Sequence, residues 1–414
     1  MLNHNYIDRA INDIKTQFNN NSDEYIQRAL NLIEAKELQN IERYLNEISY
    51  EEFYRRLLKN IQPDDDIKDL SHFNQTCNAP HSSLYFDMNG NVYPCCMNKN
   101  FSYGNITKTS LKKIVFGEKR IFLQNKLDNY NFSFGCTSCG NMIKSNNKES
   151  SYTTNFKQFK KENNYLKVFP QVFEFSLHNT CNLTCVTCGG DFSSSIRLKI
   201  EKRPKLKMVY TDKFLNELKE FIPHLKVCRF VGGEPFLIAY YKKIWDLIKK
   251  YNKNCIISIT TNGTVLSKTV LDMLNYHNTH IICSIDALDK NVFESIRIGA
   301  DFSKIMNNLN LFLSKKKLKA LAVTPTVLNM FEIPRLLSFC AEKNIDIYFN
   351  HAYDYLSGYK PQEVRQKIFI HQLNPKAIED YILFLDNNFK KANFNEYYNK
   401  KMQSFINRTK LFLN

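Results

Sequence analysis

Short apolar runs alternate with amphipathic segments through the middle of the chain, between about residues 165 and 350. Each run has the length of one strand, and each amphipathic segment repeats its apolar residues at helical spacing. The predicted strands are Val172–Leu177, Val227–Val231, Cys255–Thr261, His280–Ile285, Leu318–Leu328 and Ile345–Phe349. The predicted helices between them are Thr211–Ile222, Tyr240–Lys250, Ser267–Tyr276, Phe302–Ser314 and Phe331–Lys343. This alternation indicates βαβ units and a parallel sheet, here a partial (β/α)6 barrel over residues 165–355.

Both ends of the chain have a helical pattern. Residues Ile7, Ile11, Ile14 and Phe18 step by four, three and four, which places them on one face of a helix. Residues 1–70 carry a net charge of −5, so we expect an acidic helical extension there. A polar helical region is expected over residues 356–414.

Residues 71–150 have a different pattern, which predicts a small domain built on a β-hairpin. The runs Leu84–Met88 and Asn91–Pro94 flank Asn89-Gly90, the pair that favours a type I′ turn. A hairpin here brings the position of Cys77, before its first strand, close to that of Cys95, at the end of its second. A helix is predicted over Ser110–Leu127.

The charge and hydropathy of the chain narrow the function classes. The 414 residues carry a formal net charge of +16, and the mean hydropathy is −0.42. An apolar run of about 18 residues is lacking, which argues against a membrane span. The start lacks the pattern of a secretory signal, so we expect a cytoplasmic protein. The basic charge is either a compositional bias or an adaptation to an acidic partner. The strongest basic stretch, 197–207, contains no aromatic residue for base stacking, which argues against nucleic acid.

Twelve cysteines are the most informative feature of the composition. Clustered cysteines in a cytosolic chain are more often metal ligands than disulfides. Cys181, Cys185 and Cys188 follow the first predicted strand of the parallel sheet, at a spacing that can wrap one iron–sulfur cube and leave one iron open. A zinc site with His178 as the fourth ligand is the alternative that this spacing leaves open.

This triad and the segments after it resemble the radical S-adenosylmethionine (SAM) superfamily. Gly232-Gly233-Glu234-Pro235 follows the second strand of the sheet and resembles the motif whose glycine backbone lies against the SAM amino group. Segments 260–263, 284–286 and 293–299 resemble family segments that face SAM. The resemblance implies cofactor contacts by Gly232, Gly233, Glu234, Pro235, Asn262, Ser284, Asp286 and Arg297. Thr187 stands where many members have an aromatic residue.

A second cysteine group resembles the SPASM or twitch auxiliary-cluster domain, which here precedes the barrel. Its four thiolates are Cys77, Cys95, Cys136 and Cys139, with Cys96 as an alternative to Cys95. The resemblance implies an auxiliary [4Fe–4S] cluster bound by four cysteines, and a zinc ribbon is the alternative. Four further cysteines lie in apolar runs and are expected in the core: Cys228, Cys255, Cys283 and Cys340.

The resemblance implies an oxidoreductase or maturase that cleaves SAM reductively to a 5′-deoxyadenosyl radical, which abstracts hydrogen from a substrate C–H bond. The three-cysteine [4Fe–4S] cluster binds SAM and receives an electron from a flavodoxin-like or ferredoxin-like donor. A four-thiolate auxiliary cluster suits electron transfer and hence net oxidation. The expected substrate is a peptide or protein, with a sugar or other acidic metabolite as the alternative and a non-catalytic electron carrier as a further one. His351, Tyr353 and Asp354 follow the last strand and are candidate catalytic residues.

Overall fold

The computed structural model describes residues 9–15, 67–145, 151–159, 169–350, 368–392 and 394–413. The chain divides into two compact units. The first unit comprises residues 1–174 and 209–224, and the second comprises 175–208 and 225–414. Most of the expected helical extension lies outside the described residues, although 9–15 is helical.

The first unit contains the predicted hairpin. Strands β1 (Ser83–Phe86) and β2 (Asn91–Tyr93) pair antiparallel, with Tyr85 opposite Tyr93, and β3 (Gly104–Asn105) pairs with β2. The predicted type I′ turn is wrong, because that turn needs positive φ at two residues and here only Gly90 has it, at 86°. The Gly90 N–H donates to the Asp87 carbonyl, and Asp87 N–H donates to Asn91, as in a three-residue loop with a left-handed glycine.

Helices pack beside this hairpin in the first unit. The predicted helix Ser110–Leu127 is two helices, α6 (Leu111–Val115) and α7 (Glu118–Asp128), interrupted at Phe116 and Gly117. The other helices of the unit are α5 (Ala79–Ser82), α8 (Thr137–Lys144) and α9 (Asp212–Phe221). Although α9 is distant in sequence, its Phe214 makes an edge-to-face contact with Phe86 of β1, with ring centroids 5.4 Å apart.

The second unit has the expected alternation of strands and helices, except that the first predicted helix, Thr211–Ile222, is α9 and belongs to the first unit. Strands β5 to β9 follow one another in order and pair parallel. They are β5 (Val227–Phe230), β6 (Ile256–Thr261), β7 (Thr279–Ser284), β8 (Leu318–Val323) and β9 (Asp346–Phe349), while β4 (Val172–Phe175) contains the boundary between the units. All six predicted strands are therefore present, and the fold is of the mixed α/β class. The predicted strand Leu318–Leu328 ends early, at Val323, and Pro325 beyond it has no N–H to donate to a neighbour.

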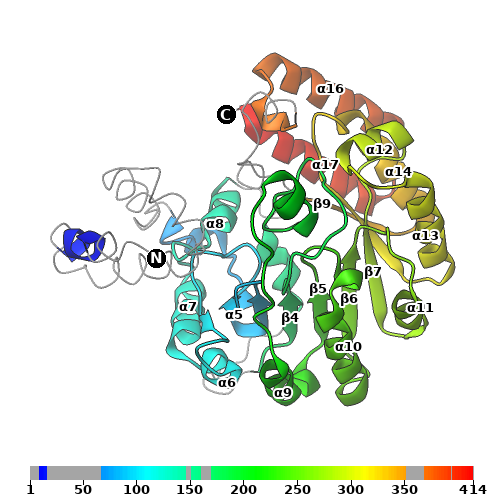
Figure 1. The fold of residues 1–414 in the computed structure, drawn as a ribbon. Coiled ribbons are helices and arrows are strands. Elements are labelled where there is room, and N and C mark those ends of the chain that lie inside the picture. Colours follow the sequence, from blue (N-terminus) through cyan, green and yellow to red (C-terminus); the bar gives the residue numbers. More distant parts are fainter. Residues whose placement is uncertain are drawn as a thin grey trace. The chain divides into compact units, whose positions relative to one another are not determined.

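Helices connect these strands, and Figure 1 shows α10, α11 and α13 flanking β5 to β7. The helices are α10 (Ala239–Tyr251), α11 (Lys268–Asn275), α12 (Lys290–Ile296), α13 (Phe302–Ser314) and α14 (Ile333–Lys343). A π-helical turn, η6 (Ile196–Ile200), follows the cysteine triad. The C-terminal region is helical as expected, with α16 (Pro375–Lys391) and α17 (Glu396–Lys410). Within the described residues, no helix has the length and apolar character that a membrane span requires.

The tyrosine hydroxyl of Tyr241, on α10, ties together the ends of two strands in the second unit. It accepts the N–H of Leu177 at 2.9 Å and lies 2.9 Å from the Phe175 carbonyl and 2.7 Å from the Val231 carbonyl. Tyr241 is fully buried. Buried backbone groups need a hydrogen-bond partner, and here the tyrosine hydroxyl is that partner. The loops that leave β4 and β5, which carry the predicted site, therefore start from fixed positions.

Candidate functional site

The three cysteines of the predicted core site lie on one loop after β4. Cys181, Cys185 and Cys188 are all half-buried. The Ser194 hydroxyl accepts the N–H of Cys181 at 3.1 Å, and the hydroxyl of Ser195 donates to the Cys181 carbonyl at 2.8 Å. Ser194 and Ser195, six and seven residues after the last cysteine of the triad, thus bind the backbone of its first cysteine, which no motif in the sequence indicated.

The same loop is also bound to the end of α12. The N–H groups of Thr184 and Val186 donate to the carbonyls of Ile298 and Ile296, at 3.0 and 2.9 Å. These bonds alternate with the cysteines along the loop, so the segment after α12 supports the thiols. Segment 293–299, which the resemblance implies faces SAM, is thus bound through its backbone to the cysteine loop.

His178 was the alternative fourth ligand, and both of its ring nitrogens have hydrogen-bond partners. Nε2 lies 3.2 Å from the carbonyl of Leu206, so it donates, and Nδ1 lies 2.6 Å from the Thr180 hydroxyl. Burial lowers the pKa of His178, which favours the neutral ring. His178 thus holds Thr180, the residue directly before Cys181, through its ring.

The glycines of Gly-Gly-Glu-Pro lie against the backbone that leads into the cysteine loop. The N–H of Gly233 donates to the His178 carbonyl at 3.1 Å, and that of Glu234 donates to the Thr180 carbonyl at 2.7 Å. Gly232 has φ +115°, and a Cβ there would lie 2.8 Å from His178 O; one on Gly233 would lie 2.6 Å from the carbonyl carbon of Asn179. Gly232 and Gly233 are therefore needed for the close approach to residues 178–180, and the approach of the SAM amino group to them stays a prediction.

Glu234 connects this motif to the end of β6. Its carboxylate accepts the N–H of Asn262 at 2.7 Å, the Thr261 hydroxyl at 2.8 Å and the N–H of Phe236 at 3.1 Å. The side chain is fully buried, and burial raises the pKa of Glu234 to about 7 against the lowering effect of these donors. Asn262, in turn, directs its amide nitrogen toward the Cys181 sulfur at 3.9 Å.

Asp286 and Arg297, predicted as polar contacts of the cofactor, pair with each other. Arg297 Nε lies 2.8 Å from Asp286 Oδ2, and their side chains are only 12% and 1% exposed. Asp286 also accepts the N–H of Thr324 at 2.8 Å. Burial raises the pKa of the nearby Cys185 to about 11, and Arg297 opposes that rise. Ser284, half-buried, is the last residue of β7.

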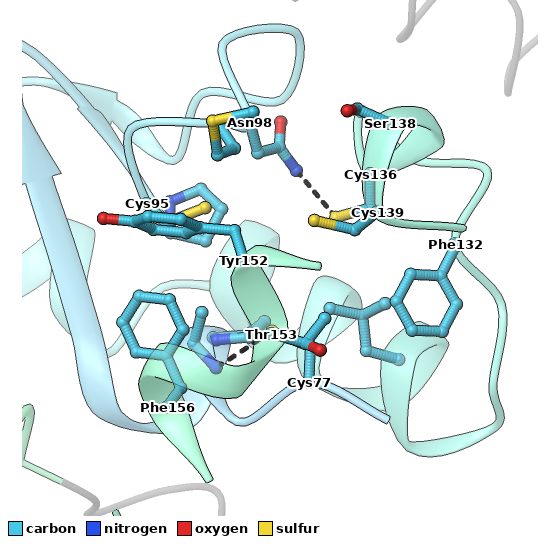
Figure 2. A pocket seen from close by; sticks show the side chains of 16 residues that line it. Cys77, Cys95, Asn98, Phe132, Cys136, Ser138, Cys139, Tyr152, Thr153 and Phe156 are labelled. Atoms are coloured by element: carbon cyan, nitrogen blue, oxygen red, sulfur yellow. Dashed lines mark hydrogen bonds between the residues drawn. The ribbon is translucent and has the colours of Figure 1, made fainter. Parts of the chain in front are cut away.

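The four cysteines of the second predicted site line a single pocket in the first unit (Figure 2). Cys77 precedes α5, Cys95 follows β2, and Cys136 and Cys139 lie at the start of α8. The rest of the wall is mainly apolar and includes Pro80, Pro94, Leu127, Phe132 and Phe156. Three separate segments thus bring four thiols into one buried space, which fits a four-thiolate cluster site.

Burial raises the pKa values of all four thiols in this pocket. Burial raises the pKa of Cys77 to about 12, with a further contribution from Cys139. Burial is also the largest cause that raises the pKa values of Cys95, Cys136 and Cys139. Without a bound group these thiols stay protonated at neutral pH, so cluster binding must release protons.

Cys96 does not line this pocket, which separates it from Cys95. Burial raises its pKa, followed by the negative charge of Glu174. Among the described residues, no three His, Cys, Asp or Glu side chains, the thiols of this pocket included, are placed to hold a single metal ion. Cys228, Cys255, Cys283 and Cys340 are buried, as expected for core residues. His351, Tyr353 and Asp354 lie outside the described residues.

The α/β fold, the three-cysteine loop and the separate four-thiol pocket together fit the class of proteins with two iron–sulfur sites. Residues 175–340 match the family model of the radical SAM superfamily, and residues 77–140 match that of an iron–sulfur cluster-binding domain, SPASM. The chain is thus a radical SAM protein with a SPASM-type auxiliary cluster domain. That domain precedes the radical SAM domain, as the sequence predicted.

Several known proteins are similar to parts of this chain. The GTP 3′,8-cyclase of Campylobacter jejuni subsp. doylei is 28% identical over 225 residues, which are 50% of this chain and 64% of that protein. The molybdenum cofactor biosynthesis protein moc-5 of Caenorhabditis elegans is 27% identical over 47% of this chain and 30% of its own. Among solved structures, anSMEcpe with bound AdoMet is 24% identical over 53% of this chain and 58% of its own, with a TM-score of 0.41.

The two matched domains determine the cofactors. The radical SAM domain implies a [4Fe–4S] cluster that binds SAM, and the SPASM domain implies an auxiliary iron–sulfur cluster. The donor sets fit both groups: three thiols on one supported loop, and four thiols in one buried pocket.

Proposed function

We propose that this chain is an enzyme that cleaves SAM reductively and abstracts a hydrogen atom from a C–H bond of its substrate. The observation that carries the proposal is the cysteine loop held between two motifs: Gly233 and Glu234 bind its entry, and residues 296–298 bind its middle. An iron–sulfur electron carrier does not need these supports around a three-thiol loop. The [4Fe–4S] group with SAM supplies the radical chemistry.

The side chains around the loop have separate roles in this proposal. Cys181, Cys185 and Cys188 hold the cluster, and Glu234 fixes Asn262 beside Cys181. Gly232 and Pro235 shape the loop on which Glu234 lies. Asp286, paired with Arg297, and Ser284 provide polar groups for SAM at the ends of the strands.

For the substrate we propose a peptide or protein, with an acidic small molecule as the second candidate. The auxiliary-cluster domain supports the first candidate. The second is supported by the similarity to GTP 3′,8-cyclases, whose substrate is an acidic nucleotide. His351, Tyr353 and Asp354 are the candidates for binding substrate or removing a proton beyond β9. A net oxidation, in which the auxiliary cluster accepts the substrate's electron, is the proposed outcome.

The enzyme proposal is tested by SAM cleavage under anaerobic conditions. The reconstituted protein, given a reductant and SAM, should form 5′-deoxyadenosine, and Cys185→Ala should abolish it. Loss of product with the auxiliary cluster still present would be the expected result for this variant. If the wild-type protein has both clusters and forms no 5′-deoxyadenosine, the electron-carrier alternative replaces the enzyme.

The substrate class is tested in the same assay. GTP and candidate peptides are added separately, each deuterated at carbon, and deuterium in 5′-deoxyadenosine identifies the one that loses hydrogen. Transfer from GTP alone would exclude the peptide, and transfer from a peptide alone would exclude the nucleotide.

A further inference from the structure

The amide of Asn98 reaches one thiol of the four-thiol pocket. Asn98 Nδ2 lies 3.3 Å from Cys136 Sγ, and Figure 2 shows this hydrogen bond. The side chain belongs to the loop after Cys95 and is 1% exposed. A polar side chain this deeply buried is expected to have its hydrogen-bonding groups paired, and here the sulfur is one of the partners.

Two further hydrogen bonds fix the orientation of this amide. Nδ2 donates to the Phe134 carbonyl at 2.9 Å, and Oδ1 accepts the N–H of Phe101 at 3.0 Å. If the amide were reversed, oxygen would face the Phe134 carbonyl, and nitrogen would face an N–H. The network therefore places a donor, and not an acceptor, against the sulfur.

Gly135, immediately before Cys136, makes room for this contact. Its φ is +72°, and a Cβ there would lie 2.8 Å from Asn98 Cγ. Glycine is thus needed at this position for the backbone conformation and also for the amide beside it. The amide, the glycine and the thiol form one fitted arrangement.

The contact to Cys136 differs from those at two other thiols. Cys77 accepts the backbone N–H of Ala79 at 3.5 Å. At Cys139, the Ser151 side chain and the backbone at Tyr152 and Thr153 lower the pKa of the thiol, against the larger rise that burial causes. The donor to Cys136 is a side-chain amide, so a substitution can remove it without changing the backbone.

We propose that Asn98 raises the reduction potential of the auxiliary cluster by donating this hydrogen bond to the sulfur of Cys136. Reduction adds one electron, whose charge spreads over the sulfurs, and an N–H directed at a sulfur stabilises the reduced form. The apolar wall of Leu127, Phe132 and Phe156 strengthens the effect, because the local dielectric constant is low. Asn98 gives and takes no electron itself. The inference rests on the proposed four-thiol cluster and makes that cluster a better electron acceptor.

The test compares reduction potentials in protein whose core triad is replaced, Cys181→Ala/Cys185→Ala/Cys188→Ala, so that only the auxiliary cluster contributes a signal. A redox titration followed by electron paramagnetic resonance should give a lower potential for Asn98→Ala. We expect a change of about tenfold in the reduction equilibrium, or about 59 mV for one electron. Ser138→Ala is the matched control, since Ser138 lines the same pocket and should leave the potential unchanged. An equal potential in Asn98→Ala and its parent would overturn the proposal.

A second measurement keeps the proposal testable if Asn98→Ala does not assemble its cluster. The same triad-replaced protein, labelled with asparagine that carries ¹⁵N only in its side-chain amide, should show a ¹⁵N coupling to the reduced cluster in pulsed electron paramagnetic resonance. Among the described residues that line the pocket, Asn98 is the one asparagine, so the coupling can be assigned to it. Lack of coupling in an assembled cluster would overturn the role of Asn98 alone. If the triad-replaced parent contains no cluster and the wild-type protein contains only one, the four-thiol site itself is wrong.

Discussion

The carboxylate of Glu234 accepts the backbone N–H of Asn262 at 2.7 Å and thereby joins the loop after β5 to the end of β6. Both ends of this connection lead to the cysteine loop. The N–H of Glu234 binds the Thr180 carbonyl, and the Asn262 amide lies 3.9 Å from the Cys181 sulfur. A buried acid is thus a structural link between two parts of the core site.

Glu234 should make the protein less stable as the pH rises. Burial raises its pKa from 4.5 to about 7, so between these values the folded state keeps a proton that the unfolded state has lost. Stability is therefore lost from about pH 4.5 to about pH 7. Relative to Glu234→Gln, the unfolding free energy of the wild type should fall by about 2 to 3 kcal/mol between pH 5 and pH 8. Urea unfolding of both proteins in the same cluster state measures this, and parallel pH curves would contradict it.

Gly233→Ala should disturb the entry to the cysteine loop. A Cβ at this position would lie 2.6 Å from the carbonyl carbon of Asn179 and even closer to the Thr180 carbonyl oxygen. Backbone atoms cannot move aside as a side chain can, so we expect a loss of about 1 to 3 kcal/mol in stability and incomplete core-cluster assembly. Gly299→Ala is the comparison, because its nearest neighbour would be 3.8 Å away and only its φ of +91° is strained. Iron content and thermal unfolding should separate the two variants, and equal effects would rule out the steric explanation.

Arg297→Gln should destabilise the second unit by leaving Asp286 buried without its ion pair. The expected loss is about 3 to 5 kcal/mol, since an uncompensated buried charge is costly. Asp286→Asn added to Arg297→Gln removes that charge and should restore most of the stability. Denaturant unfolding of the two single variants and the double variant measures their coupling. A double variant as unstable as the sum of the singles would show that the pair is not coupled.

Cys95→Ala and Cys96→Ala should differ, although the two residues are adjacent. Cys95 lines the four-thiol pocket and Cys96 does not. Anaerobically reconstituted wild type should contain about eight irons per chain, Cys96→Ala about eight, and Cys95→Ala about four. Iron and acid-labile sulfide analysis gives these values, with zinc measured in parallel. The reverse pattern would make Cys96 the ligand, and zinc in place of the missing iron would make the pocket structural.

The sequence predicted the elements that depend on local patterns. The helix Phe302–Ser314 has the predicted bounds, and each predicted strand is present, although the strand predicted over 318–328 ends at Val323. Their periodicity is set by burial, which the residues themselves encode. The prediction of one helix over 110–127 is wrong, because the helix is interrupted at Gly117 between α6 and α7. Apolar periodicity alone does not reveal an interruption of so few residues.

The sequence predicted the residues of the candidate site that belong to motifs, but not the partners of those residues. Cysteine spacing and the Gly-Gly-Glu-Pro segment indicated the thiols and their neighbours. The partners of those residues come from distant parts of the chain: Asp286 could be named from its segment, but not its pairing with Arg297. Asn98 has no signal at all beyond lying three residues after Cys95. Its role depends on a turn at Gly135 that only the folded chain brings near it.

The first unit is not one continuous stretch of sequence, and this restricts how the protein can have been assembled from parts. The chain leaves the unit after residue 174 and returns for residues 209–224. The returning segment packs Phe214 against Phe86, and its Glu217 accepts the Leu111 N–H at 2.7 Å. A gene fragment that ends at residue 174 therefore encodes an incomplete module. Moving this unit into another protein would require both pieces together, residues 1–174 and 209–224.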